Sequence, residues 1–84
     1  MKLTFSDEAW EDYLYWQKQD RKMVERINKL LKEVQRDPFV GVGKPEPLKH
    51  ALSGLWSRRI TDEHRMVYRV TEDSLEVAQL RFHY

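Results

Sequence analysis

Hydrophobic residues recur at helical spacing in two neighbouring stretches early in the chain. The clearer stretch follows the i, i+3, i+4, i+7 pattern of a helix with one buried face, at Met23, Val24, Ile27, Leu30, Leu31 and Val34. A second apolar stripe runs from about residue 7 to 18, with Ser6 before it as an N-cap candidate. Asp20 is the N-cap candidate of the clearer helix, and Pro38 ends that helix near Arg36. The short break between the two stretches predicts an antiparallel helical hairpin.

Alternation of apolar and polar residues predicts strands on both sides of this hairpin. The first strand is short and runs from residue 2 to 5, and three further segments read as strands, at residues 55–60, 65–71 and 75–84. The last two are joined by a polar turn and form a β-hairpin.

A loop with several Gly and Pro residues, at residues 39–47, separates the helices from the later strands. Residues 48–52 fit either a strand or a helical turn. The order of elements predicts an α+β fold, in which a short N-terminal strand and a helical hairpin precede an antiparallel β-meander packed on the helices. We expect residues 1–84 to form a single domain.

If the apolar residues of both strands of the last hairpin lie on one face, its positively charged residues lie together on the other face. Met66, Tyr68 and Val70 would then share the core face with Ala78, Leu80 and Phe82. The opposite face would carry Arg65, Arg69, Arg81 and His83. Three arginines beside a histidine repel one another unless an anion lies among them, so the pattern predicts a phosphate-binding surface. A solvated polar face is the alternative.

Composition narrows the function classes. The chain has no cysteine, which excludes disulfides, a thiol nucleophile and thiolate metal sites. Its start lacks the apolar run of a signal peptide, and no stretch is long and apolar enough for a membrane span, so we expect a soluble, cytoplasmic protein. The net charge is only +1, but residues 44–69 hold six Lys or Arg against three Asp or Glu, a weak indication of nucleic-acid binding.

Several motifs, in this order, resemble one known family. They are Lys44-Pro45-Glu46-Pro47-Leu48-Lys49-His50, Leu55-Trp56-Ser57-Arg58-Arg59-Ile60-Thr61, Glu63-His64-Arg65 and the ending Arg81-Phe82-His83-Tyr84. Together with the opening Met1-Lys2-Leu3 and Tyr13-Leu14-Tyr15-Trp16, they make the chain similar from end to end to the YoeB toxins of bacterial type II toxin–antitoxin systems, within the RelE superfamily.

The resemblance implies a microbial-RNase-like fold and a ribosome-dependent mRNA endonuclease, an mRNA interferase that cleaves mRNA in the A site and blocks translation. It implies a YefM-like antitoxin as partner, and repression of the operon by the toxin–antitoxin complex on operator DNA. It implies no cofactor and no metal, and a homodimer is compatible with it. The alternative is a non-catalytic superfamily toxin or corepressor that acts by protein binding, and a third reading is a ribonuclease that works without the ribosome.

The family's catalytic positions carry over onto four residues of this sequence. The resemblance assigns Glu46 as general base, Arg65 as phosphate stabiliser and His83 as general acid, and it places Tyr84 in the site. These residue types suit RNA cleavage, because the reaction needs a base, an acid and positive charge on the phosphate oxygens. The alternatives are a surface glutamate, an arginine paired with Glu63 or Glu46, a frayed terminus, and a tyrosine that caps the core instead of stacking on a base.

Further cations are candidates for phosphates of mRNA or ribosomal RNA, namely Lys49, Arg59, Arg69 and Arg81. Strand alternation puts Arg58 and Arg59 on opposite faces, and we expect Arg59, which shares its face with Ser57, to be the one at the site. For Lys49 a solvated role is the alternative. His50 and His64 lack partners at ligand spacing, and we interpret both as structural or surface residues.

Overall fold

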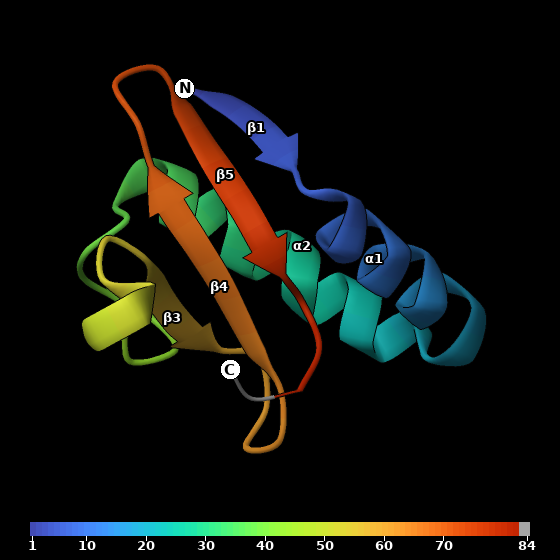
Figure 1. The fold of residues 1–84 in the computed structure, drawn as a ribbon. Coiled ribbons are helices and arrows are strands. Elements are labelled where there is room, and N and C mark those ends of the chain that lie inside the picture. The colour runs from blue at the N-terminus through green and yellow to red at the C-terminus, as the bar shows by residue number, and fades with distance from the viewer. Residues whose placement is uncertain (83–84) are drawn as a thin grey trace.

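Five strands form one sheet in the part of the chain that the computed structural model describes, residues 1–82. Their order across the sheet is β1-β5-β4-β3-β2. The strands are β1 (Lys2–Phe5), β2 (Glu46–Pro47), β3 (Trp56–Arg59), β4 (Arg65–Val70) and β5 (Ser74–Gln79). The two helices are α1 (Asp7–Gln19) and α2 (Arg21–Arg36), and α2 passes behind the sheet in Figure 1.

The predicted α+β architecture is confirmed, with one addition. Strands β2 to β5 pair antiparallel with their neighbours, as a meander does, but β1 pairs parallel with β5. The sheet is therefore mixed rather than purely antiparallel. The hydrophobic pattern of β1 predicts a strand but carries no information about its direction relative to a neighbour that lies far along the chain.

The predicted caps explain where the helices begin. The hydroxyl of Ser6 accepts a hydrogen bond from the Ala9 amide at 3.0 Å, which satisfies one donor of the first turn of α1. The Asp20 carboxylate accepts from the amides of Lys22 and Met23 at 3.1 and 3.3 Å. Its own amide donates to the Trp16 carbonyl at 2.8 Å, so Asp20 ends α1 and begins α2.

The core lies between the two helices and one face of the sheet. Its helical side consists of Ala9, Trp16, Met23, Ile27, Leu30, Leu31 and Val34, and its sheet side of Ile60, Met66, Tyr68, Leu75, Val77 and Leu80. The pattern that predicted α2 therefore marks its buried face. Residues 48–52, which fitted two structures, contain the 3₁₀ turn η1 (His50–Leu52). Neither α1 nor α2 is long and apolar enough to cross a bilayer.

The end of the chain differs from the prediction. Strand β5 ends at Gln79 rather than continuing, and Val67 faces Gln79 while the next residue, Tyr68, faces Val77. Ala78 is therefore an extra residue, a β-bulge that reverses the alternation of side chains. The predicted core face is confirmed for Met66, Tyr68 and Leu80. It was wrong for the rest of the last strand, because of this bulge. Leu75, Val77 and Leu80 are buried, whereas Phe82 is 55 % exposed.

Candidate active site

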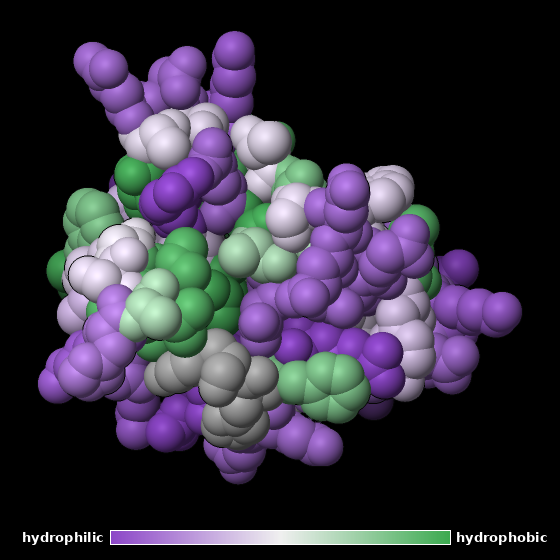
Figure 2. Space-filling model, in the orientation of Figure 1, coloured by the Kyte–Doolittle hydropathy of each residue, from purple (hydrophilic) through white to green (hydrophobic). Residues whose placement is uncertain are grey.

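Three adjacent strands place Glu46, Arg59 and Arg65 on the same face of the sheet. Glu46 on β2 lies opposite Ser57 on β3, and Arg59, two residues further along β3, lies opposite Arg65 on β4. Residues that face each other across neighbouring strands point the same way, as do residues two apart in one strand. The three side chains therefore emerge on the face opposite the helices, which is mostly hydrophilic (Figure 2).

Arg58 and Arg59 point to opposite faces, as strand alternation predicts. Arg58 is fully buried on the core side, where its guanidinium donates to the carbonyl oxygens of Asp37, Val40 and Val42 and to the hydroxyl of Tyr68. The Arg59 side chain is exposed, and its Nη1 lies 3.9 Å from the carboxylate of Asp62. Arg59 is therefore the accessible cation of this pair.

The guanidinium of Arg65 is held by the turn that precedes β4. Its Nη1 donates to the carbonyl oxygens of Thr61 and Asp62 at 2.8 and 2.9 Å, and to that of His64 at 3.3 Å. The residue is 9 % exposed. Within residues 1–82, no Asp or Glu forms an ion pair with it, so the pairing with Glu63 or Glu46 that was the alternative is absent there. Carbonyl contacts orient this cation without neutralising it.

The segment after β5 runs back to the start of β4. The Leu80 amide donates to the Asp12 carboxylate at 3.0 Å, and its carbonyl accepts from the Trp16 indole at 2.9 Å. Two residues later, the Phe82 amide donates to Nδ1 of His64 at 2.8 Å, and the Phe82 carbonyl accepts from the amide of Arg65 at 3.0 Å. The chain therefore reaches Arg65 immediately before His83. His83 and Tyr84 themselves lie outside the described residues.

Glu46 borders a shallow hollow on the outer part of the sheet. The hollow has a volume of about 320 Å³, and Lys49 and His50 also line it. Glu46 is exposed on β2, between two prolines that restrict its backbone. His50, which we interpreted as structural or surface, is exposed here and has a φ of 58°. The geometry thus brings a carboxylate, an ammonium group and an imidazole around one opening.

Arg65 and Arg69 share one face of β4 as predicted, but the predicted cluster of three unpaired arginines was wrong. Arg69 lies opposite Glu76, whose carboxylate accepts from its Nε and Nη2 at 3.0 and 2.7 Å. The guanidinium of Arg81 lies 3.5 Å from the ring centroid of Tyr15 on α1. The prediction placed Arg81 on the last strand, beside Arg65 and Arg69 on the strand before it, but β5 is bulged and ends before Arg81. Each of these two arginines therefore has a partner of its own.

Gln79 and His64 contribute to the site although they were not assigned to it. The Gln79 amide group donates to the carbonyl oxygens of Arg81 and Phe82 at 3.0 and 3.4 Å, and His64 holds the amide of Phe82. Both fix the course of the chain towards His83. Alternation assigned Gln79 to the outer face correctly, but its contact with the following segment depends on the bulge, for which the sequence has no signal.

Comparison with known proteins identifies the family. Residues 5–84 match the family model of the YoeB-like toxin of bacterial type II toxin-antitoxin system. The chain is 63 % identical over 84 residues to Toxin YoeB of Escherichia coli (strain K12), with each chain covered completely.

Solved structures show the same fold. One, described as the YoeB/ParE toxin from Agrobacterium tumefaciens, is 56 % identical over the whole of both chains, with a TM-score of 0.97. Two come from Staphylococcus aureus, a YoeB dimer and a heterotetrameric YoeB-YefM toxin-antitoxin complex. Both are 48 % identical, cover 100 % of this chain and 98 % of theirs, and have TM-scores of 0.93 and 0.91. The chain therefore belongs to the YoeB-like toxins of bacterial type II toxin–antitoxin systems.

Proposed function

We propose that this toxin is a ribosome-dependent mRNA endonuclease that cleaves mRNA in the A site of the translating ribosome. The observation that carries the proposal is the common face of Glu46, Arg59 and Arg65, together with the return of the chain to the amide of Arg65 just before His83. A carboxylate and two guanidinium groups on one face of the sheet suit a phosphodiester that is attacked on one side and stabilised on another.

The proposed reaction is attack by the ribose 2′-OH on the neighbouring phosphorus. Glu46 takes the hydroxyl proton as general base, and His83 gives a proton to the departing 5′ oxygen as general acid. Arg65 stabilises the negative charge on the non-bridging oxygens, for which its fixed orientation is favourable. The products are a 2′,3′-cyclic phosphate and a 5′-hydroxyl end, and Tyr84 stacks on a base at the site.

The ribosome has a physical role in this proposal. Among the four candidate RNA contacts, Arg69 already pairs with Glu76, and Arg81 lies over Tyr15. Lys49 and Arg59 remain as exposed cations, too few to hold an RNA strand by counterion release alone. The ribosome would supply the grip on mRNA and present the A-site codon to the toxin.

We also propose a YefM-like antitoxin as partner, since YoeB of S. aureus forms a complex with YefM. The complex would bind operator DNA and repress its own operon. A homodimer is proposed on the same basis, because YoeB of S. aureus also forms a dimer.

The test is translation of a defined message in vitro with purified wild-type, Glu46→Gln and His83→Gln proteins, followed by primer extension to map new 5′ ends. We expect wild type to cut at the A-site codon and each variant to cut more slowly by about 10² to 10⁴, the range for loss of a general acid or base. Glu72→Gln is the matched control, because Glu72 is exposed in the turn between β4 and β5.

If translation is inhibited but the message is not cut, the proposed nuclease activity is contradicted. That result would favour a toxin that acts by binding a target. Equal cutting by wild type and both variants would retain the nuclease but remove Glu46 and His83 as its base and acid. If the protein cuts RNA without ribosomes as fast as it cuts the translated message, the ribosome has no part in the mechanism.

A further inference from the structure

The chain just before His83 is held by His64. This histidine lies in the turn between β3 and β4 and is buried, with 8 % of its surface exposed. Nδ1 of its ring accepts the hydrogen bond of the Phe82 amide at 2.8 Å. The Phe82 carbonyl has two donors, the amide of Arg65 at 3.0 Å and the side chain of Gln79 at 3.4 Å. Loss of the His64 ring would therefore leave the carbonyl held but free the amide.

This hydrogen bond requires one protonation state of the ring. An imidazole nitrogen accepts a hydrogen bond from an N–H group only when it carries no proton of its own. In this arrangement His64 is therefore neutral, with its proton on Nε2. A proton on Nδ1 would set two donors against each other, so the ring serves here as an acceptor directed at the chain.

The conformation of Phe82 depends on its surroundings. Its φ is 63°, in the left-handed region that residues with a Cβ rarely adopt. The Phe82 side chain is 55 % exposed, so burial in the core does not impose this conformation. The hydrogen bonds to its peptide groups are what maintain it, as expected where the surrounding structure over-determines a residue.

The His64 ring is itself fixed by packing. It meets the indole of Trp16 on α1 edge to face, with ring centroids 4.8 Å apart and an interplanar angle of 76°. The same indole donates to the Leu80 carbonyl at 2.9 Å. Trp16 and His64 therefore hold the segment after β5 at two points, two residues apart, and Nδ1 is directed at Phe82 without further adjustment.

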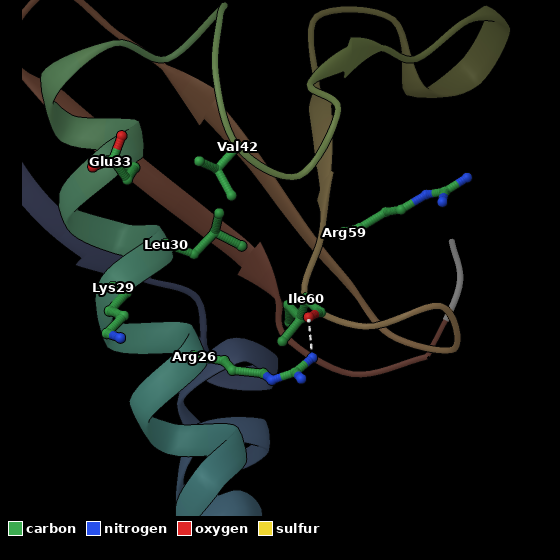
Figure 3. Close-up of a pocket in the computed structure, with 7 residues that line it drawn as sticks. All are labelled: Arg26, Lys29, Leu30, Glu33, Val42, Arg59 and Ile60. Carbon is green, nitrogen blue, oxygen red and sulfur yellow. Dashed lines mark hydrogen bonds between the residues drawn. The ribbon is translucent and has the colours of Figure 1, made fainter.

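The turn that presents His64 is also tied down. Its carbonyl accepts from the amides of Ile60 and Thr61 at 2.9 and 3.2 Å, and its amide donates to the Thr61 hydroxyl at 3.1 Å. The Ile60 carbonyl accepts from Nη1 of Arg26 on α2 at 3.4 Å, the dashed line in Figure 3. The turn thus has contacts to α2 on one side, while the His64 ring contacts α1 on the other.

His64 contacts the support of a second site residue. Its carbonyl oxygen lies 3.3 Å from Nη1 of Arg65, beside the stronger contacts of that atom to Thr61 and Asp62. The backbone of His64 therefore helps to orient the proposed phosphate stabiliser, while its ring holds the chain that leads to the proposed acid. One residue links the positions of both.

We propose that His64 is a positioning residue for His83. Its neutral imidazole maintains the left-handed turn at Phe82, which sets the direction in which the chain enters His83 and so the place of the general acid relative to Arg65. His64 takes no part in proton transfer in this role. The inference rests on the nuclease mechanism proposed above, in which His83 is the acid.

The test compares His64→Leu with His64→Asn in single-turnover cleavage of mRNA on programmed ribosomes. The two new side chains have nearly the same shape, but the Asn oxygen can take the place of Nδ1 as acceptor. His64→Leu should lower the maximal cleavage rate by about 10- to 100-fold, as for a catalytic group misplaced by about 1 Å. The toxin concentration at half-maximal rate should change by less than about twofold, and His64→Asn should stay within about fivefold of the wild-type rate.

A second background separates positioning from general damage to the fold. In the His83→Gln protein, His64→Leu should cause no further loss, because the acid that His64 positions is already missing. Equal factors of loss in the two backgrounds would indicate a merely structural role and overturn the proposal. If His64→Leu does not fold, His64→Gln replaces it, because its amide reaches the place of Nε2 instead of Nδ1, and the same loss is expected.

The hydrogen bond is also measured without any assay of activity. The ¹⁵N shifts of the His64 ring in the wild-type protein at about pH 8 should show Nε2 protonated and Nδ1 unprotonated. A proton on Nδ1 would overturn the proposal, as would a wild-type cleavage rate in His64→Leu or equal losses in the Leu and Asn variants.

Failure of the nuclease mechanism gives a different result. It appears as uncut message with wild-type protein, or as undiminished cutting by His83→Gln, while the ring of His64 still shows an unprotonated Nδ1. Either result overturns the positioning role as well, since no acid would remain to be positioned.

Discussion

Arg58 is a cation inside the protein whose hydrogen-bond partners are carbonyl oxygens and a phenol instead of a carboxylate. It is fully buried and joins the loop at residues 37–42 to Tyr68 of β4, whose own hydroxyl donates to the Pro38 carbonyl at 2.6 Å. A buried charge is costly unless its donors are satisfied, and here several backbone acceptors satisfy it. These hydrogen bonds offset the cost of burying the charge. They also hold in place the loop that leads to Glu46.

Replacement of Arg58 by methionine should lower the free energy of unfolding by about 2 to 4 kcal/mol, because carbonyl oxygens of the loop and the Tyr68 hydroxyl would lose their donor. Arg59→Met is the matched control one residue along, where the side chain is exposed, and its effect should stay within about 0.5 kcal/mol. Urea unfolding at neutral pH measures both. Similar stability of the two variants would show that the buried guanidinium contributes no net stability.

Tyr68 should make the protein less stable in alkali. Burial raises the pKa of its hydroxyl above the ordinary value of 10.0, although the hydrogen bond and charge of Arg58 act in the opposite direction. The folded state then keeps a proton that the unfolded state releases above its own pKa, so stability is full below about pH 10 and falls as pH rises toward the folded pKa.

Unfolding by urea from about pH 9 to about pH 11 tests this dependence. Tyr68→Phe, which cannot titrate, should be less stable at pH 9 because it lacks the hydrogen bonds of the hydroxyl, yet it should lose less stability over the same interval. Parallel losses in both proteins would assign the alkaline effect to other groups.

The sequence indicated the direction of these side chains but not their partners. Alternation in β3 was enough to separate Arg58 from Arg59. It could not reveal that Arg58 is the centre of the loop contacts, because the carbonyl groups that it binds belong to a segment without periodicity. Arg65 is a similar case, since its guanidinium is oriented by backbone oxygens that any sequence would provide.

Among the elements, the helices were the most predictable, because their signals are local. Apolar spacing, Ser6, Asp20 and Pro38 define α1 and α2 to within a residue or two of the observed ends. The last strand was the least predictable. A single extra residue, Ala78, changes which side chains face the core, and this residue becomes visible only in the pairing of β5 with β4.

Asp20 connects the two helices, so its substitution tests that element. Asp20→Ala should lower the free energy of unfolding by about 1 kcal/mol, because the amides of Lys22 and Met23 lose their side-chain acceptor at the start of α2. Glu25→Ala, at an exposed position within α2, is the control, and we expect a change within about 0.5 kcal/mol. Thermal unfolding followed by circular dichroism measures both, and equal midpoints for the two variants would contradict the capping role.

At the scale of the whole molecule, the sequence predicted the layers but not the arrangement of the sheet. The α+β class follows from the order of helices and strands, whereas the parallel pairing of β1 with β5 joins segments from the two ends of the described chain. The grouping of Glu46, Arg59 and Arg65 likewise depends on the register of β2, β3 and β4. Family resemblance named these residues, and strand register explains why three of them share a face.

The pairing of β1 with β5 has a consequence during protein synthesis. The first strand is made at the start, but its hydrogen-bonding partner is complete only when residue Gln79 has left the ribosome. Until then the sheet lacks the pairing of β1 with β5, and the core lacks Leu75, Val77 and Leu80. The fold of this chain is therefore completed only when nearly all of its residues have been made, because its first strand is paired last.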